Sequence, residues 1–410
     1  MPINVDVIIF GGGAAGLWVL DELTRKGRSA LLLESQALGQ WQTIASQGII
    51  HGGLKYSLQG LLTKSAEQIR EMPVVWRECL AGRREPNLSQ TRLRSDACYL
   101  WRTDTITSRL GMLGAKLGLR IAPETVASHD RPDVLRSCPG SAFRLPEQVI
   151  CPITFLENLA DRHPGRIRKV DPAGIQWELN EVGGVRSLHL SSIGNEKLHL
   201  KLNCVIFAAG AGNAALRNAV GLPSPVMQRR PLHMVMLRGR LPVLNGHCVD
   251  GAKTRITVTS TTDSRGDTIW QVGGQLTEDG VNMEPGPLLR HARSELLASI
   301  PGLDLSRAEG STYRADRAEA KTAAITRPET AQVIEDQNIL TAWPTKLALA
   351  PKLAERLCEL VCQSPPVPAN PAALEVLKNW PRPEVATPPW ETATEWYKLD
   401  GEFAADKSAA

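Results

Sequence analysis

The sequence lacks the features that mark several specialised classes of protein. Only 5% of its residues are aromatic, and no basic stripe is interleaved with them, which excludes the stacking surface of a single-stranded nucleic-acid binder. The formal net charge of +4 over 410 residues is too weak for nucleic acid to be the main partner. No apolar run reaches the roughly 18–20 residues that span a membrane, and residues 7–20, the nearest candidate, contain three consecutive glycines. We therefore expect no nucleic-acid partner and no transmembrane segment.

Cysteine patterns of metal or disulfide proteins are also missing. The eight cysteines are scattered and form no Cys-x-x-Cys pair. Cys358 and Cys362 are four residues apart on a predicted helix, but two thiols without further ligands are weak evidence for metal. The chain carries Asp6 and no basic segment near its start, unlike a secretory signal. We expect buried, reduced thiols in a cytoplasmic protein and no metal site.

What the chain does contain is the composition of an ordinary folded protein. Hydrophobic residues make up 42% and charged residues 22%, which is enough apolar surface for a large core. With roughly 100–200 residues per domain, this length predicts two or three structural units.

The first 35 residues follow a strand–turn–helix–strand pattern. Residues 5–10 are apolar and β-branched, which predicts a buried parallel strand. Glycine-rich residues follow at once, and residues 17–26 read as a helix with leucines on one side. Residues 29–33 form a second apolar strand that ends at Glu34. A strand, tight turn and helix in this order are the setting that a phosphate-binding glycine motif requires.

The glycine motif itself is G-x-G-x-x-G. Gly11 permits the turn, Gly13 lets the backbone approach a pyrophosphate, and Gly16 lets the helix pack close to the strand. The helix N-terminus offers free N–H groups and a positive dipole end to the phosphates. Glu34 can accept hydrogen bonds from ribose hydroxyls and would repel a 2′-phosphate. The sequence therefore predicts dinucleotide binding, by FAD or NAD rather than NADP.

Two further strands extend the predicted nucleotide-binding sheet. Residues 204–207 run into the small residues 208–213, and residues 338–343 lead into a helix over 351–361. Between these stretches the pattern changes, because residues 255–259 and 268–272 alternate and are bounded by turns, as in antiparallel strands. The chain therefore predicts one sheet built from separated segments and a second, interleaved domain.

This division gives bounds for each unit. We expect a discontinuous nucleotide-binding domain, an interleaved substrate or cap domain, and a proline- and tryptophan-containing extension that wraps the surface or binds a partner subunit. The nucleotide-binding domain is expected at residues 1–89, 151–225 and 316–362. The substrate or cap domain is expected at 90–150 and 226–315, and the extension at 363–410.

Several ordered motifs are similar to those of one enzyme family. They are Ser46-Gln-Gly-Ile-Ile-His-Gly-Gly-Leu-Lys-Tyr56, residues 231–235, Tyr313-Arg-Ala-Asp-Arg317, Ala324-Ile-Thr-Arg327 and Thr345-Lys-Leu347. Together they resemble the FAD-dependent oxidoreductases of the D-amino-acid oxidase superfamily, and within it the flavin-linked glycerol-3-phosphate dehydrogenases. The resemblance covers roughly residues 3 to 362, spread over separate motifs.

The resemblance implies both a fold and a cofactor. The fold class would be α/β, with a Rossmann-like FAD-binding domain of the glutathione-reductase type and an interleaved antiparallel-sheet substrate domain. FAD rather than NAD would be the tightly held cofactor. The residues expected to contact it are Gly11, Gly13, Ala14, Ala15, Gly16, Glu34, Ser35, Ser46, Gly48, Gly52, Ala209, Gly210, Lys346 and Leu347.

The sequence departs from the family pattern at positions near the expected site. Lys55 replaces an arginine, and Ala318 replaces a proline. Pro344 and Thr345 replace two glycines at the flavin loop. These departures concern the identity of the substrate more than the flavin chemistry.

Two histidines are candidate bases for oxidising an alcohol or amine. His51 and His233 lie in family-like motifs, and histidine exchanges protons near neutral pH. The alternative for each is structural, with His51 only supporting or covalently holding the flavin ring. The other six histidines have no distinctive sequence neighbours, so we expect them to be structural.

Cations in the same motifs are candidates to bind an anionic substrate. Arg317 and Arg327 could each offer a bidentate fork, whereas Lys55 would provide a point charge. Tyr56 could donate a hydrogen bond to the substrate or only pack. Lys346 precedes the last predicted helix, where a positive charge would stabilise an anionic reduced flavin.

The leading functional hypothesis is an FAD-dependent dehydrogenase or oxidase acting on the C–H of a small anionic alcohol. Glycerol-3-phosphate-like substrates come first and 2-hydroxy acids next. The alternatives are an amine or amino-acid oxidase on the same fold, and a non-catalytic flavin-binding subunit of a complex. Oxygen, a quinone and a partner protein are all compatible electron acceptors.

Overall fold

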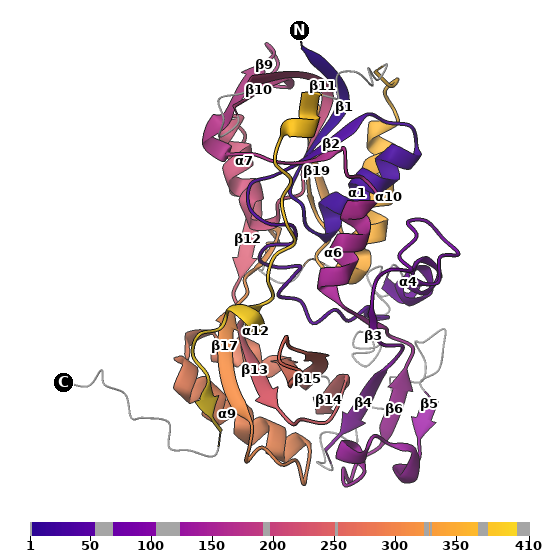
Figure 1. Ribbon diagram of the computed structural model, residues 1–410, viewed down its shortest axis with the longest axis vertical. Helices are drawn as coiled ribbons and strands as arrows, with labels where there is room; N and C mark the ends of the chain where they lie inside the picture. The colour runs from indigo at the N-terminus through magenta and orange to yellow at the C-terminus, as the bar shows by residue number, and fades with distance from the viewer. Residues whose placement is uncertain are drawn as a thin grey trace, which may run out of the picture.

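Two large sheets dominate the structure (Figure 1). The computed structural model describes residues 2–53, 69–103, 124–191, 197–250, 253–323, 328, 330–367 and 376–399. A mixed eight-stranded sheet contains the start of the chain, and a nine-stranded sheet lies at the opposite end of the molecule. The mixed α/β class predicted from the sequence is confirmed.

The eight-stranded sheet joins segments that are far apart in the sequence. Its strands are β1 (Ile3–Phe10), β2 (Ala30–Glu34), β8 (Ile167–Lys169), β9 (Ile175–Leu179), β10 (Val185–Ser191), β11 (Lys197–Phe207), β19 (Gln332–Asp336) and β20 (Ile339–Trp343). The main order is β19-β20-β11-β1-β2-β8, with β10 and β9 continuing from β11 as antiparallel neighbours. Because β11, β1, β2 and β8 are parallel, the carboxyl ends of β1, β2 and β11 lie at one edge of the sheet.

Strand β1 shows why both faces of this sheet are covered. Val7 and Ile9 join a core with the helices, whereas Ile8 and Phe10 join a core on the opposite face with β10 and the tail. Successive side chains of a strand alternate, so a continuous apolar run needs partners on both sides. The α-helices of the described residues are α1 (Ala14–Arg25), α4 (Met72–Leu80), α6 (Pro152–Asp161), α7 (Asn213–Ala219), α8 (Gln275–Asp279), α9 (Pro285–Ser299), α10 (Ala350–Val361) and α12 (Pro389–Thr392).

The nine-stranded sheet has one apolar and one more polar face. Its strands are β4 (Cys98–Arg102), β5 (Glu124–Val126), β6 (Ala142–Leu145), β13 (His233–Gly239), β14 (Gly246–Asp250), β15 (Lys253–Thr262), β16 (Thr268–Gly273), β17 (Glu309–Arg314) and β21 (Tyr397–Lys398). They follow the order β21-β17-β13-β16-β15-β14-β4-β6-β5. Val235 and Trp270 pack with α9 on one face. Gln271, next to Trp270, therefore points to the other face, where it bonds loop residue Ala45.

Two small antiparallel sheets lie between the large ones. β3 (Leu93–Ser95) pairs with β7 (Val149–Ile150), and β12 (Met227–Arg230) pairs with β18 (Arg317–Ala320) (Figure 1). The chain therefore crosses several times between the two large sheets. The domain bounds given above stay a prediction.

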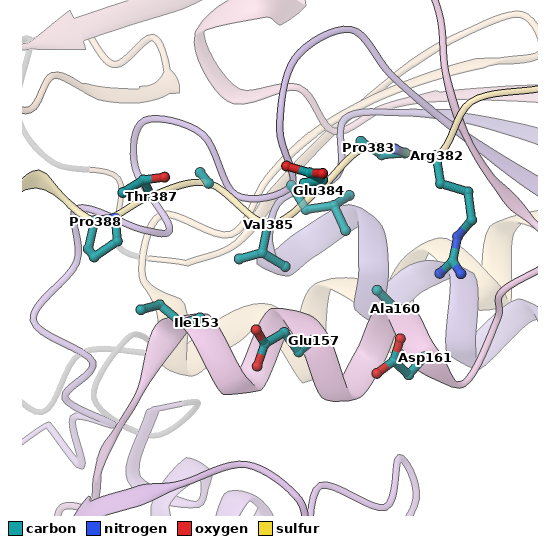
Figure 2. Close-up of a pocket in the computed structure, with 12 residues that line it drawn as sticks. Ile153, Glu157, Ala160, Asp161, Arg382, Pro383, Glu384, Val385, Thr387 and Pro388 are labelled. Carbon is teal, nitrogen blue, oxygen red and sulfur yellow. The ribbon is translucent and has the colours of Figure 1, made fainter. Parts of the chain in front are cut away.

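The C-terminal tail contacts both large sheets. Val385 forms a bridge with Leu38 beside the eight-stranded sheet, and β21 adds an edge strand to the nine-stranded sheet. Where the tail passes α6 it leaves a groove of about 490 Å³, with Glu157 and Asp161 on the helix side and Arg382 on the tail side (Figure 2). The tail therefore connects the eight-stranded sheet to the nine-stranded sheet.

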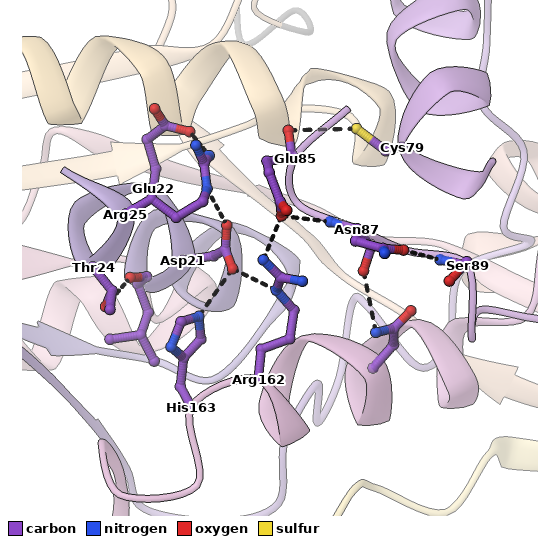
Figure 3. Close-up of polar contacts among 12 residues, drawn as sticks. Asp21, Glu22, Thr24, Arg25, Cys79, Glu85, Asn87, Ser89, Arg162 and His163 are labelled. Atoms are coloured by element: carbon purple, nitrogen blue, oxygen red, sulfur yellow. Dashed lines mark hydrogen bonds and ion pairs between the residues drawn. The ribbon is translucent and has the colours of Figure 1, made fainter. Parts of the chain in front are cut away.

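A buried carboxylate joins α1 to the end of α6. Asp21 is fully buried and accepts hydrogen bonds from Arg25 at 2.7 Å and Arg162 at 2.7 Å, and it lies 3.0 Å from Nε2 of His163 (Figure 3). Arg162 also pairs with Glu85. Burial raises the pKa of Asp21, but these hydrogen bonds outweigh it and lower the pKa to about 2.

Several elements match their sequence predictions within a few residues. The expected helix over 17–26 begins earlier, at Ala14, because the helix starts directly after the glycine turn. The strand expected at 204–207 is the end of the longer β11, and the helix expected at 351–361 is α10. In the described part of the chain, no helix combines the length and apolar character that crossing a membrane requires.

Candidate active site

The glycine turn between β1 and α1 brings backbone segments into close contact. Gly11 has φ of +110°, and a Cβ atom built on it would lie 2.6 Å from the carbonyl oxygen of Ala208. A Cβ atom on Gly16 would lie 1.9 Å from the carbonyl oxygen of Gly11. Neither position can hold a larger side chain without moving backbone, so the turn keeps the open helix N-terminus that a pyrophosphate requires.

Glu34 ends β2 beside this turn. Its Oε2 accepts the N–H of Gly12 at 2.6 Å, and its Oε1 accepts those of Ser35 and Gln36 at 2.8 and 2.9 Å. A carboxylate has about four acceptor positions, so room is left for a ribose hydroxyl. The turn and the acid therefore have the arrangement that binds an adenosine ribose next to a pyrophosphate.

The loop after β11 lies against the same turn. The N–H of Ala209 donates to Oδ1 of Asn213 at 2.8 Å, and the amide of Asn213 donates to the carbonyl of Ala342 at 3.1 Å. Gly210 has φ of +56°. A buried asparagine thus fixes the predicted cofactor residues Ala209 and Gly210 between β11 and β20.

A second loop, residues 45–53, runs from the nucleotide end towards the nine-stranded sheet. Ile150 donates to the carbonyl of Gly48 at 2.9 Å, and a Cβ atom on Gly48 would lie 2.1 Å from the carbonyl oxygen of Ile150. The Oγ atom of Ser46 is buried and has no hydrogen-bond partner among the described residues. A buried polar atom without a partner is costly, so a ligand group at Ser46 fits this loop.

The end of this loop brings two histidines to one buried carboxylate. Nδ1 of His51 lies 3.5 Å from Oε2 of Glu147, and Nε2 of His247 lies 3.8 Å from the same oxygen. The two imidazole rings are 5.5 Å apart at their centroids. His51 is 43% exposed at its side chain, whereas Glu147 is 5% exposed. One imidazole of the group is therefore accessible from outside while the carboxylate is sealed.

Glu147 is held as an anion. Burial raises its pKa, but the contacts with His247 and His51 outweigh burial and bring the pKa well below its ordinary value. The N–H of Gly52 donates to its Oε1 at 2.6 Å. On the far side, Nδ1 of His247 lies 2.9 Å from Oγ1 of Thr257. These contacts set the positions of the two rings.

The polar face of the nine-stranded sheet meets the loop at Ala45. Its carbonyl accepts from the Tyr313 hydroxyl at 2.9 Å and from Nε2 of Gln271 at 3.4 Å. Gln47 donates to the carbonyls of Thr257 and Gln271 at 3.2 and 2.8 Å. Ser46 and the histidine–carboxylate group therefore lie along the same junction between loop and sheet.

An arginine with few partners lies nearby on β3. Nε and Nη1 of Arg94 are buried and have no hydrogen-bond partner in the described part of the chain. Its Nη2 lies 4.0 Å from Sγ of Cys151, and its Cζ lies 5.6 Å from the centre of the Trp390 ring. Burial lowers the pKa of Arg94, and the contact with the Cys151 thiol partly opposes this. A buried cation without a carboxylate partner favours an anionic ligand.

The other predicted site residues are distributed differently. His233 on β13 is buried, with Nδ1 3.1 Å from the carbonyl oxygen of Met283 and Nε2 2.9 Å from Oγ1 of Thr312. Burial lowers its pKa, and Arg314 acts in the same direction. Arg317 on β18 pairs with Glu278 at 3.2 Å. Both side chains thus have partners inside the protein.

The flavin loop keeps the backbone that glycine would give. Thr345 has φ of +60°, in the left-handed region, at a position where the resembled family has glycine. Lys346 is buried, and Leu347 begins the 3₁₀ turn that leads into α10. Of the remaining predicted residues, Lys55, Tyr56 and Arg327 lie outside the described residues.

Sequence reasoning missed Glu147, His247, Gln271 and Arg94. His247 was grouped with the structural histidines because no motif surrounds it. One weak signal was available, since Glu147-Gln148 is a polar pair set directly before an apolar strand. Only the pairing of β14 with β4 and of Ile49 with Val149 brings Glu147 and His247 to His51.

Comparison with known proteins places the chain in a family. The family model described as FAD dependent oxidoreductase (DAO) matches residues 6–330. A probable FAD-dependent oxidoreductase of Pseudomonas aeruginosa, PA4991, is 39% identical over 396 residues, which are 95% of this chain and 98% of that protein. The chain therefore belongs to the DAO family of FAD-dependent oxidoreductases.

Solved structures agree with this assignment. The crystal structure of PA4991 has a TM-score of 0.80 at 36% identity, covering 95% of this chain and 98% of that one. An L-α-glycerophosphate oxidase from Mycoplasma pneumoniae with FAD bound has a TM-score of 0.63 at 14% identity. The match covers 90% of this chain and 97% of that one. A glycine oxidase from Geobacillus kaustophilus has a TM-score of 0.61 at 13% identity. The match covers 91% of this chain and 98% of that one. The last two likenesses concern the fold alone.

FAD is therefore the cofactor of this protein, and the residues present fit it. The glycine turn offers an open helix N-terminus for the pyrophosphate, and Glu34 has acceptor positions left for the ribose. The Oγ of Ser46, which has no hydrogen-bond partner among the described residues, lies at the junction with the nine-stranded sheet and is a fitting position for a polar group of the flavin end. FAD supplies a hydride acceptor when it is bound, and the protein supplies position and charge.

Proposed function

We propose that this enzyme oxidises the CH–OH group of a small anionic alcohol, with His51, Glu147 and His247 handling the hydroxyl proton. The observation that carries the proposal is the buried, ionised Glu147 between two imidazoles. An ionised carboxylate stabilises the positive charge that a histidine gains on accepting a proton. His51 is the more exposed imidazole, so it is the ring that meets the substrate hydroxyl.

The need for a base favours an alcohol over an amine. A neutral amine can lose a hydride without prior proton removal, whereas an alcohol must give up its hydroxyl proton as the C–H bond breaks. A positioned general base contributes typically about 10²–10⁴-fold to such a step. The histidine–carboxylate group would serve the alcohol reaction directly.

Arg94 is the cation that we assign to the anionic end of the substrate. Its Nε and Nη1 lack partners among the described residues, whereas Arg317 is paired with Glu278. Tyr313 links this region to the loop through its bond to Ala45. Guanidinium binds carboxylate and phosphate alike, so glycerol-3-phosphate and 2-hydroxy acids both fit this assignment.

The test is anaerobic reduction of the flavin in the FAD-loaded protein. We expect glycerol-3-phosphate or 2-hydroxyglutarate to bleach the visible flavin absorbance, and uncharged glycerol to be far slower. Bleaching by glycine or another small amino acid, with no response to either alcohol, would reject the CH–OH assignment in favour of amine oxidation. Dithionite serves as the positive control, and silence towards every donor in protein that dithionite reduces would overturn catalysis in favour of a flavin-binding subunit.

A further inference from the structure

A second group of metal-ligating side chains lies on the eight-stranded sheet. His189 on β10 and His199 on β11 are directly paired across the two antiparallel strands. Each histidine lies between buried leucines whose side chains point into the core, so both imidazoles emerge on the opposite, partly exposed face. Glu178 on β9 reaches the same face.

The three side chains are already close together. Nε2 of His189 lies 2.7 Å from Oε1 of Glu178, and Nε2 of His199 lies 4.0 Å from Oε2. The two imidazoles are stacked, with centroids 4.1 Å apart and planes 19° apart. All three ligand atoms lie within 4.8 Å of one another. A single ion could therefore contact one atom of each residue.

The surroundings favour ligation over an ordinary surface ion pair. Nε2 of His199 is buried and has no hydrogen-bond partner within the described part of the chain. Ser187 donates a hydrogen bond to Glu178 and fixes the direction of its carboxylate. Support of this kind from behind a carboxylate is typical of built metal sites.

We propose that Glu178, His189 and His199 form a binding site for a divalent transition-metal ion of the zinc type. Zinc bonds of about 2.0–2.2 Å in tetrahedral geometry place ligand atoms about 3.4 Å apart. His189 lies 2.7 Å from Oε1 and His199 4.0 Å from Oε2, and the three ligand atoms lie within 4.8 Å of one another, so side-chain rotations can bring them to that spacing. Two imidazoles and one carboxylate select zinc, nickel or copper over magnesium or calcium, which prefer oxygen ligands.

Binding changes the proton on one ligand. An imidazole nitrogen must be unprotonated to bind a metal, so the hydrogen that His189 shares with Glu178 leaves Nε2 when the ion enters. Three protein ligands leave a fourth position to water. The ion would tie β9, β10 and β11 together at the end of the molecule away from the nine-stranded sheet (Figure 1).

The experiment is zinc titration of tag-free, FAD-loaded, EDTA-treated protein by isothermal calorimetry at neutral pH. We expect one zinc ion per chain with a micromolar dissociation constant, a raised unfolding temperature, and no heat with magnesium. H199N and E178Q should each weaken zinc binding at least tenfold, because each removes one ligand, while flavin content and turnover stay unchanged. H129N is the matched control, since His129 is exposed and lies 3.3 Å from Asp130, away from the three proposed ligands.

Two results would overturn the proposal. The first is wild-type zinc affinity in both H199N and E178Q. The second is loss of zinc binding in H247N but not in H199N, which would move the ion to the histidine–carboxylate group of the active site. Because the readout is heat and stoichiometry, neither outcome depends on the substrate assigned above.

Discussion

The N–H of Gly52 donates to Oε1 of Glu147 at 2.6 Å, and this contact leaves Oε2 to the two histidines. A backbone donor from the loop of residues 45–53 thus fixes a carboxylate that comes almost a hundred residues later in the chain. Oε1 therefore holds the carboxylate in position, and Oε2 presents its negative charge to the two imidazoles. It also makes the loop and the nine-stranded sheet parts of one site.

Replacing Glu147 by Gln should remove the charge and keep the volume. We expect kcat to fall by about 10²-fold or more, since the imidazolium that forms during proton transfer loses its counter-charge. Flavin content should stay near that of the wild type, because Glu147 lies away from the glycine turn. Anaerobic single-turnover reduction with glycerol-3-phosphate or 2-hydroxyglutarate, whichever reduces the wild-type flavin, measures the effect. E157Q on the outer face of α6 is the control, and equal rates for E147Q and wild type would remove Glu147 from the mechanism.

Gly16→Ala should release the cofactor. Its new methyl group would lie 1.9 Å from the carbonyl oxygen of Gly11, so the turn must open and the helix N-terminus must leave the pyrophosphate. We expect the purified variant to lose most of its flavin absorbance. Gly165→Ala is the matched change, because nothing lies within 4 Å of a Cβ atom there. Retention of full flavin content by Gly16→Ala would contradict the placement of the pyrophosphate.

Arg94→Gln should weaken binding of the anionic donor. A charge-assisted hydrogen bond contributes about 1.5–3 kcal/mol, so KM should rise about tenfold or more, and uncharged donors should be little affected. Arg92→Gln is the matched control, because Arg92 is exposed and its Nη2 contacts the same thiol, Cys151, at 3.5 Å. Cys151→Ser separates two roles of Arg94, binding the anionic donor and pairing with the Cys151 thiolate. If pairing with the thiolate were its role, Cys151→Ser would be as impaired as Arg94→Gln. An unchanged KM in Arg94→Gln would require another cation for the substrate.

Asp21 should make the free energy of unfolding depend on pH. Its pKa is about 2 in the folded protein against an ordinary 3.8, so its stabilising contribution is complete above about pH 4 and is lost as the pH falls through 2. The shift corresponds to about 2 kcal/mol. We expect the free energy of unfolding of the wild type to approach that of D21N as the pH falls from 5 to about 2. Urea titrations followed by circular dichroism measure this, with exposed Asp161→Asn as control, and parallel pH curves for D21N and wild type would refute the assignment.

Local sequence was enough for the nucleotide end of the fold. Gly11, Gly16 and Glu34 lie within 24 consecutive residues of one strand–turn–helix–strand unit, so their spacing determines their geometry. At Thr345 the local sequence carries no such signal, because its backbone is left-handed although threonine stands where the resembled family has glycine. A left-handed backbone is therefore readable from adjacent residues only where glycine marks it.

The group formed by His51, Glu147 and His247 could not be found in this way. Glu147 is 96 residues from His51 and His247 is 100 residues from Glu147. No short motif encodes their meeting, because sheet pairing and the Ile49–Val149 bridge produce it. His233 has a better motif than His247, yet the fold pairs it with Thr312 and backbone carbonyls.

The sequence by itself determined the dinucleotide turn, the α/β class and the absence of a long apolar segment, because each depends on composition or on neighbouring residues, whereas FAD rather than NAD was implied only by the resemblance to the family. Tertiary structure decided which histidines lie beside Glu147, that Arg94 has no carboxylate partner among the described residues, and how Glu178, His189 and His199 come together. Those facts depend on strand register between distant segments. A one-residue slip of β9, β10 or β11 would turn Glu178, His189 or His199, respectively, to the other face of the sheet.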